Sequence, residues 1–438
     1  MANPLTAGAA QVSISPPVGG ILWGWGPRRS DSLHDELHAR ALVLDDGATV
    51  LALVTCDLLG LGLDVAERAR ALIEQQTGLP PTNVMFNCSH THSGPFIGED
   101  RQYGEVDQAY VQTLVNKLAG AVQMAFNDRR EALIGMGTEP VQIGVNRREM
   151  TPDRGMILGH NWDGPVNPNV DVIRVDSADG RPIAVAFSHA THPIVLPGSS
   201  LAITADYPGY AAAVLEKVRG AGLVAMFAQG CGANINAQVG DRSFEDARRL
   251  GTILGAAALK ASEQVELAGE LKLNAASEVI ELPLDLPTVA EAEEVLRENE
   301  ANLAALPGET DERGLRNARR MVEWARDHLA VAQVGAPTAE PYEMQVFALG
   351  DTAIVALGSE VFVEIGLNIA ERSPAAHTAV LGYCNAYTGR YVSTAIAYDE
   401  GGYEALAHIY DGRTTVPLDP SSASLIEDAA VRLLGRLF

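Results

Sequence analysis

The feature that most constrains the fold is an alternation of short apolar runs with amphipathic segments. Residues 49–56 and 83–88 are apolar runs typical of buried strands, whereas residues 64–76 and 105–127 carry apolar residues at a helical period. The pattern continues with a strand at 182–187, a helix at 209–219 and a strand at 221–228. Alternation of this kind predicts an α/β architecture.

A segment of different composition interrupts this pattern in the second half of the chain. Residues 287–334 are rich in Ala, Glu, Arg and Leu and are broken at Pro307-Gly308, which predicts an inserted αα-hairpin. Three roles are open for this hairpin: a solvated structural element, a lid over a site, or a contact between subunits. The residues after it predict strands near 342–349, 352–358 and 377–383 and helices near 361–372 and 421–437. Without repeats or long linkers, residues 1–438 are expected to form one domain.

Charge and composition exclude several classes of partner. The chain has 56 acidic and 32 basic residues and a net charge of -24. Because such a surface repels phosphate backbones and anionic headgroups, neither a nucleic acid nor a membrane is expected as a partner. The N-terminal segment lacks signal-peptide features and no run approaches a membrane span, so a cytoplasmic location is expected. In that compartment the cysteines are expected to be free thiols, namely Cys56, Cys88, Cys231 and Cys384.

Histidines follow two of the expected strands. His90 and His92 stand two residues apart in NCSHTHSGP, and His192 lies in HATHP after the strand at 182–187. Strand ends are where α/β folds place their sites, and zinc prefers neutral imidazoles with a carboxylate and one open position. The sequence therefore predicts a metal site. Spacing alone leaves the carboxylate open between Glu360, Glu364, Asp57 and Asp206.

Several motifs follow one another along nearly the whole chain. They are AGAAQVSISPPVGG, LHARALVLDDG, CSHTHSGP, NRR, THPIVL, DYPGY, FAQGCGANINA, LGSEVFVEIG and GYCNAYTGRYVSTAIAYDEGGYEA. In these motifs and their order the chain resembles the neutral/alkaline non-lysosomal ceramidase family. The resemblance implies a mixed β-sheet core flanked by helices, and a zinc amidase with one Zn²⁺ per chain. Manganese, iron or cobalt would suit the same ligands.

The resemblance also implies roles for individual residues. The metal ligands that it implies are His90, His192, Glu360 and Tyr391, although one extra residue separates Tyr387 from Tyr391. The catalytic residues that it implies are His92, Tyr403 and Arg147. His92 would act as general base and then as acid, while Tyr403 and Arg147 would donate hydrogen bonds to the developing oxyanion.

One position departs from the family pattern. The family's serine nucleophile is replaced by Asn236 in the segment 233–237, and asparagine cannot form an acyl-enzyme by that route. Asn236 would instead bind substrate or position a water. A cysteine nucleophile at Cys231 is a further alternative. The family's C-terminal immunoglobulin-like domain is also expected to be missing.

These observations predict a zinc-dependent hydrolase of an amide bond, either N-acyl or lactam-type. The expected substrate is a small soluble molecule, attacked by metal-activated water. Three alternatives remain: a zinc-dependent lyase or cyclase acting on an amide-containing metabolite, a true ceramidase, and a non-catalytic binding homologue. The apolar positions of the 287–334 hairpin are compatible with a homo-oligomer.

Overall fold

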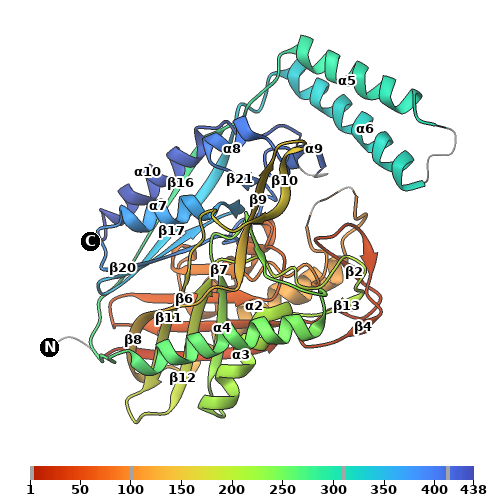
Figure 1. Ribbon diagram of the computed structural model, residues 1–438. Helices are drawn as coiled ribbons and strands as arrows, with labels where there is room; N and C mark the ends of the chain where they lie inside the picture. The colour runs from red at the N-terminus through yellow and green to blue at the C-terminus, as the bar shows by residue number, and fades with distance from the viewer. Residues whose placement is uncertain (1–3, 99, 101, 308–311, 411–414) are drawn as a thin grey trace.

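The largest element of the fold is an eight-stranded mixed sheet (Figure 1). The computed structural model describes the chain apart from residues 1–3, 99, 101, 308–311 and 411–414. In spatial order the strands are β14 (Val224–Gln229), β12 (Pro182–His189), β11 (Asn169–Ser177), β8 (Arg130–Pro140), β1 (Thr6–Ser13), β5 (His38–Asp45), β6 (Val50–Cys56) and β7 (Val84–Cys88). The pairing is antiparallel except at the two ends, where β14 and β7 run parallel to their neighbours. The predicted α/β fold with a mixed sheet is confirmed.

A four-stranded sheet packs against the inner face of the first. Its order is β16 (Leu273–Pro283), β17 (Ala339–Leu349), β18 (Thr352–Leu357) and β20 (His377–Leu381). Leu53 and Met85 of the large sheet share one buried cluster with Phe347 and Ile354 of the small one. This apolar interface joins the two sheets, because burial of apolar surface is the main favourable term in folding.

Helices cover the outer faces of both sheets. The helices on the large sheet are α1 (Leu63–Thr77), α2 (Gln108–Asn127), α3 (Asp206–Arg219) and α4 (Phe244–Gln264), and those on the small sheet are α7 (Val363–Glu371) and α10 (Ser422–Leu434). The result is four layers, helix–sheet–sheet–helix. No helix in the described part of the chain is both long and apolar enough to cross a bilayer.

Local signals explain where these helices begin and end. Asp107 accepts hydrogen bonds from the backbone amides of Ala109 and Tyr110, which caps the start of α2. Gly78, at a φ of 76°, ends α1 in the left-handed conformation that glycine adopts without strain. Ser243 and Asp246 form a capping box at the start of α4.

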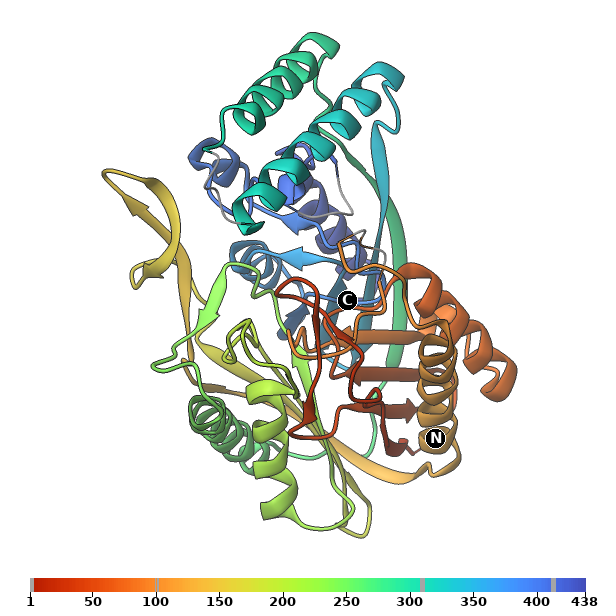
Figure 2. The same ribbon diagram turned by 90° about the vertical axis from the view of Figure 1, so that its right-hand side faces the viewer.

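Two hairpins project from the layered body. The helices α5 (Val289–Ala304) and α6 (Glu312–Val334) lie side by side, well away from the sheets (Figures 1 and 2). Gly308, where a break was expected, lies outside the described residues. The strands β9 (Gly144–Thr151) and β10 (Gly155–Asn161) form a β-hairpin that extends to the left in Figure 2.

The remaining elements are short. They are β2 (Ile21–Leu22), β3 (Arg28–Arg29), β4 (Ser32–Leu33), a 3₁₀ turn (Pro81–Asn83), β13 (Ala202–Ile203), β15 (Ile235–Ala237), β19 (Glu360–Val361), β21 (Tyr391–Val392), α8 (Ala395–Glu400) and α9 (Ala407–Tyr410). Three of them, β15, β19 and β21, carry site residues.

A buried asparagine joins the two edges of the large sheet. The Asn87 side chain on β7 accepts a hydrogen bond from the Gln229 backbone amide on β14 (2.7 Å) and donates to the Gln229 carbonyl (3.1 Å). It also donates to the Gly382 carbonyl (2.8 Å), in the segment that leaves β20. The side chain of Asn87 thereby links the ends of the two edge strands, although no backbone ladder pairs β7 with β14 among the described residues. This link holds the ends of β7 and β12 close together.

Candidate metal centre

A cavity of about 740 Å³ opens where β7, β12, β15, β19 and β21 end. It is lined by all eight residues that the sequence predicts for the site, namely His90, His92, Arg147, His192, Asn236, Glu360, Tyr391 and Tyr403. Segments more than 300 residues apart in sequence therefore meet here. Their presence in one cavity does not yet assign a role to any of them.

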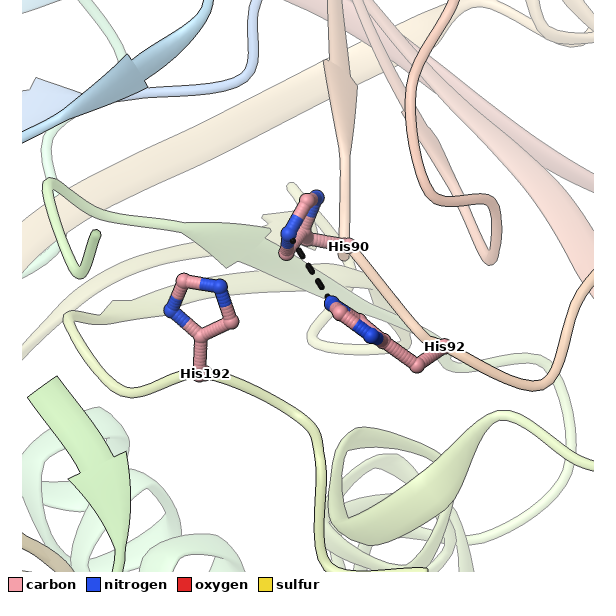
Figure 3. Close-up of side chains that lie close together, drawn as sticks. All are labelled: His90, His92 and His192. Atoms are coloured by element: carbon pink, nitrogen blue, oxygen red, sulfur yellow. Dashed lines mark hydrogen bonds between the residues drawn. The ribbon is translucent and has the colours of Figure 1, made fainter. Parts of the chain in front are cut away.

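Two histidines are oriented by backbone carbonyls. His90 Nδ1 lies 2.8 Å from the Leu59 carbonyl, and His192 Nδ1 lies 2.7 Å from the Gly232 carbonyl. Because a carbonyl only accepts, each Nδ1 carries the proton and each Nε2 presents a lone pair. Both rings are buried and face the same point (Figure 3).

The carboxylate of Glu360 completes this arrangement. Its Oε2 lies 3.5 Å from His90 Nε2 and 3.4 Å from His192 Nε2, while its Oε1 accepts a hydrogen bond from the Tyr387 hydroxyl (2.8 Å). Burial raises the pKa of Glu360, but the adjacent His90 and His192 outweigh it and hold that pKa well below its usual range. Burial lowers the pKa of His192 to about 4. The carboxylate is therefore ionised, and the imidazole of His192 beside it is neutral near pH 7.

These three groups fit a divalent cation. His192 Nε2 and Glu360 Oε2 are buried and form no hydrogen bond with the residues that the structure describes. The His192 lone pair and the carboxylate oxygen meet without a donor among the described residues, an arrangement that is costly unless a cation satisfies it. Imidazole and carboxylate are also ligands that zinc prefers.

His92 lies beside these three groups in a different environment. Its Nε2 lies 3.2 Å from His90 Nε2, and ring nitrogens of His90, His92 and His192 all lie within 4.8 Å of one another (Figure 3). These three histidines alone could hold a metal. Burial, and after it the neighbouring histidines, lower the pKa of His92 well below its usual value. Its Nδ1 is buried, forms no hydrogen bond with a described residue and packs on Gly24, where a Cβ would lie only 2.6 Å away.

Tyr391 reaches the site through strand pairing. On β21 it lies directly opposite Glu360 of β19 in a parallel pair. Its hydroxyl accepts a hydrogen bond from Arg147 Nη2 (3.2 Å). Desolvation, followed by the charge of Glu360, raises the pKa of Tyr391 well above its usual value.

Arg147 organises the other polar wall of the cavity. Its Nη1 donates to Asn236 Oδ1 (3.3 Å), and its guanidinium carbon lies 5.6 Å from the ring centres of both Tyr391 and Tyr403. Its Nε donates to Glu404 (2.7 Å), whose other oxygen binds Arg148 (2.9 Å).

Glu404 and Tyr387 are functional candidates that the sequence reasoning missed. Glu404 adjoins Tyr403 in GGYEA, but no spacing rule pairs it with Arg147. In the sequence, Tyr387 only marks the spacing to Tyr391, and no pattern indicates its hydrogen bond to Glu360.

The other carboxylates considered from spacing have separate partners. Asp57 forms a buried ion pair with Arg40 (2.9 Å). Glu364 accepts a hydrogen bond from the Asn234 side chain (2.8 Å). Asp206 is the first residue of α3 and accepts hydrogen bonds from backbone amides of Tyr207 and Leu196.

The cysteines are buried and unpaired, as expected of free thiols. Burial raises the pKa of the Cys231 thiol far above its usual range, and its Sγ packs toward Gly366. A thiol that stays protonated is a poor nucleophile. Cys231 is therefore a packing residue.

Comparison with known proteins places the chain in a family. The family described as neutral/alkaline non-lysosomal ceramidase, N-terminal, matches residues 8–247. Neutral ceramidase B of Dictyostelium discoideum is 25% identical over 229 residues, which is 49% of this chain and 30% of that protein. The match thus spans less than a third of that relative. The chain belongs to the neutral/alkaline non-lysosomal ceramidase family.

Two solved structures share the fold over nearly the whole chain. The neutral ceramidase from Pseudomonas aeruginosa superposes with a TM-score of 0.76 at 19% identity, over 99% of this chain and 74% of that one. A ceramidase complexed with C2 gives a TM-score of 0.75, also at 19% identity, over 99% and 75% of the two chains. At this identity the likeness concerns the fold.

Proposed function

We propose that the protein is a zinc-dependent hydrolase of an amide bond in a small soluble substrate. The observation that carries the proposal is the meeting of the His90 and His192 lone pairs with Glu360 Oε2 inside a cavity of about 740 Å³. Tyr391 is the proposed fourth ligand, since strand pairing sets it beside Glu360. A zinc ion bound by these residues supplies Lewis-acid chemistry, which lowers the pKa of water and polarises a carbonyl.

His92 is the proposed general base and acid. A metal-bound histidine almost always donates its second ring N–H to an acceptor, as His90 and His192 do to backbone carbonyls. His92 Nδ1 has no such partner in the described part of the chain. In the proposed reaction His92 takes a proton from the attacking water and returns it to the leaving amine.

Arg147 and Tyr403 are the proposed donors to the oxyanion that forms when water adds to the amide carbonyl. Loss of one such donor typically costs about 3 kcal/mol of transition-state stabilisation. Glu404 accepts a hydrogen bond from Arg147 Nε (2.7 Å) and fixes the guanidinium group, so that the Nη atoms of Arg147 face the cavity. Asn236 Oδ1 accepts a hydrogen bond from Arg147, and the amide nitrogen of Asn236 is proposed to face the substrate. Because Asn236 is not a nucleophile, the proposed reaction forms no acyl-enzyme.

The first test is metal content. Protein purified without chelator is expected to hold about one zinc per chain, and His90→Ala is expected to lose it, because one of three converging ligands is removed. His92→Gln should keep the metal and lose activity. A wild-type protein that takes up no zinc would contradict the proposal, and loss of metal in His92→Gln would make His92 a ligand.

The second test is the reaction itself. Hydrolysis in heavy-oxygen water places the label in the released acid, whereas a lyase or cyclase reaction does not. Ceramide is the second candidate substrate, favoured by the names of the relatives, and belongs in the same assay beside short N-acyl amides. A chain that holds zinc but releases no acid from any of them would be a binding homologue.

A further inference from the structure

A cationic side chain lies on the cavity wall away from the metal ligands. Arg242 precedes α4, is half-buried and lines the same cavity as the histidines. Its guanidinium carbon lies 5.0 Å from the centre of the Trp25 ring, and that ring lies 5.2 Å from the His92 ring. Arg242 is therefore within about 10 Å of His92, roughly the length of three extended residues.

Arg242 has unused hydrogen-bonding capacity. Its Nη2 donates to the Ile194 carbonyl (2.9 Å), but Arg242 forms no ion pair with any residue that the structure describes. Its Nε is buried without an acceptor, and Nη1 remains accessible and unbonded within the described chain. By contrast, Arg147 in the same cavity is neutralised by Glu404. An unpaired guanidinium in a partly desolvated site favours an anion.

The surroundings hold Arg242 and Trp25 in position. Trp25 lies between Gly24 and Gly26, whose φ values of 112° and 95° suit glycine, and both glycine amides donate to the Tyr103 hydroxyl. Arg242 itself has a φ of 56°, a conformation costly for a non-glycine residue. The N-terminus of α4 is not the anion site, because Ser243 and Asp246 already cap it.

We propose that the amide substrate carries a carboxylate at the end remote from the scissile bond, and that Arg242, stacked on Trp25, binds it. This inference rests on the proposed hydrolase function. It narrows the substrate to anionic amides such as N-acyl derivatives of ω-amino acids, whose carboxylate lies several bonds from the scissile bond, and it explains how a chain with a net charge of -24 attracts an anion.

The experiment compares two probes whose remote ends differ in charge, N-hexanoyl-6-aminohexanoate and N-hexanoyl-6-aminohexanamide. Release of hexanoate by zinc-loaded protein is measured for the wild type, for Arg242→Gln and for Arg242→Lys. Arg249→Gln is the matched control, since Arg249 lies on α4, donates to the Gln238 carbonyl and does not line the cavity. Arg242→Gln is expected to raise KM for N-hexanoyl-6-aminohexanoate about tenfold and to change the reaction of the amide probe less than twofold.

Other outcomes separate this inference from the function on which it rests. Equal losses for both probes in Arg242→Gln, or no wild-type preference for the anion, would overturn the carboxylate site. If neither probe is cleaved, the test is calorimetric measurement of N-hexanoyl-6-aminohexanoate binding. Binding that is lost in Arg242→Gln and retained in Arg249→Gln would support the site while the hydrolase proposal fails, and no binding would overturn both.

Discussion

The hydroxyl of Tyr387 controls which oxygen of Glu360 is available to a metal. It binds Oε1 at 2.8 Å and leaves Oε2 directed at the two histidines. Partners of this kind orient a ligand and typically account for 10- to 100-fold in metal affinity. Tyr387 is thus as much a part of the site as the residues that carry the ligand atoms.

Tyr387→Phe should therefore weaken zinc binding about tenfold while leaving the fold intact. Competition with a chromophoric chelator measures the affinity. Tyr110→Phe is the matched control, because the Tyr110 hydroxyl also binds a single oxygen, the Ile14 carbonyl, outside the site. Equal affinities in Tyr387→Phe and the wild type would remove Tyr387 from the proposed site.

A second residue makes stability depend on pH. Asp171 lies between the two sheets, where burial raises its pKa to about 6, and the hydroxyls of Ser188 and Thr138 and the imidazole of His377 face it. Because the folded state binds the proton more tightly than the unfolded chain, stability falls as pH rises from about 4 to about 6 and stays lower above that.

Asp171→Asn removes this ionisation. The variant should match the wild type near pH 4.5 and exceed it by about 1–2 kcal/mol in free energy of unfolding near pH 7.5. Urea titrations at both pH values test this, with the exposed Asp153→Asn as control. A gain of the same size at both pH values would contradict the assigned ionisation.

At the scale of elements, the sequence predicted the strands that end in the site and missed others for identifiable reasons. Residues 83–88 and 182–187 are nearly all buried, so their apolar runs stand out, and the observed β7 and β12 agree with them. The strand β16 is largely half-exposed and contains Asn, Ala and Ser, which have low strand propensity. Its conformation is set by pairing with β17 along its whole length.

The same contrast holds for the site. Strand ends and motifs predicted His90, His192 and Glu360, but the carbonyls that orient them belong to Leu59 and Gly232, which carry no side-chain signal. The sequence gives no signal for Arg242, because its contact with the Trp25 ring joins residues more than 200 positions apart. Local sequence patterns identify candidate ligands, and tertiary contacts supply the groups that orient them.

For the whole molecule, the link that Asn87 makes between the two edge strands of the large sheet is the critical connection. Asn87→Ala would leave the buried amide of Gln229 without its acceptor, whereas the Gln229 carbonyl keeps its hydrogen bond from the Gly382 amide (3.2 Å). The expected cost is about 1–3 kcal/mol, together with a looser join between the ends of β7 and β12. We expect lower stability in urea together with reduced zinc content. Asn83→Ala, which removes one hydrogen bond to the Val50 carbonyl nearby, should cost about 1 kcal/mol and retain zinc.

The distribution of the ligands along the chain has a consequence for biosynthesis. His90 and His192 leave the ribosome well before Glu360 and Tyr391, and Glu360 is held on β19 by pairing with β21. A nascent chain that stops before residue 360 has two imidazoles and no carboxylate between them, so it cannot bind zinc as the finished protein is proposed to do. Metal loading should then be one of the last steps in maturation, and a cell short of zinc would accumulate folded but unloaded chains.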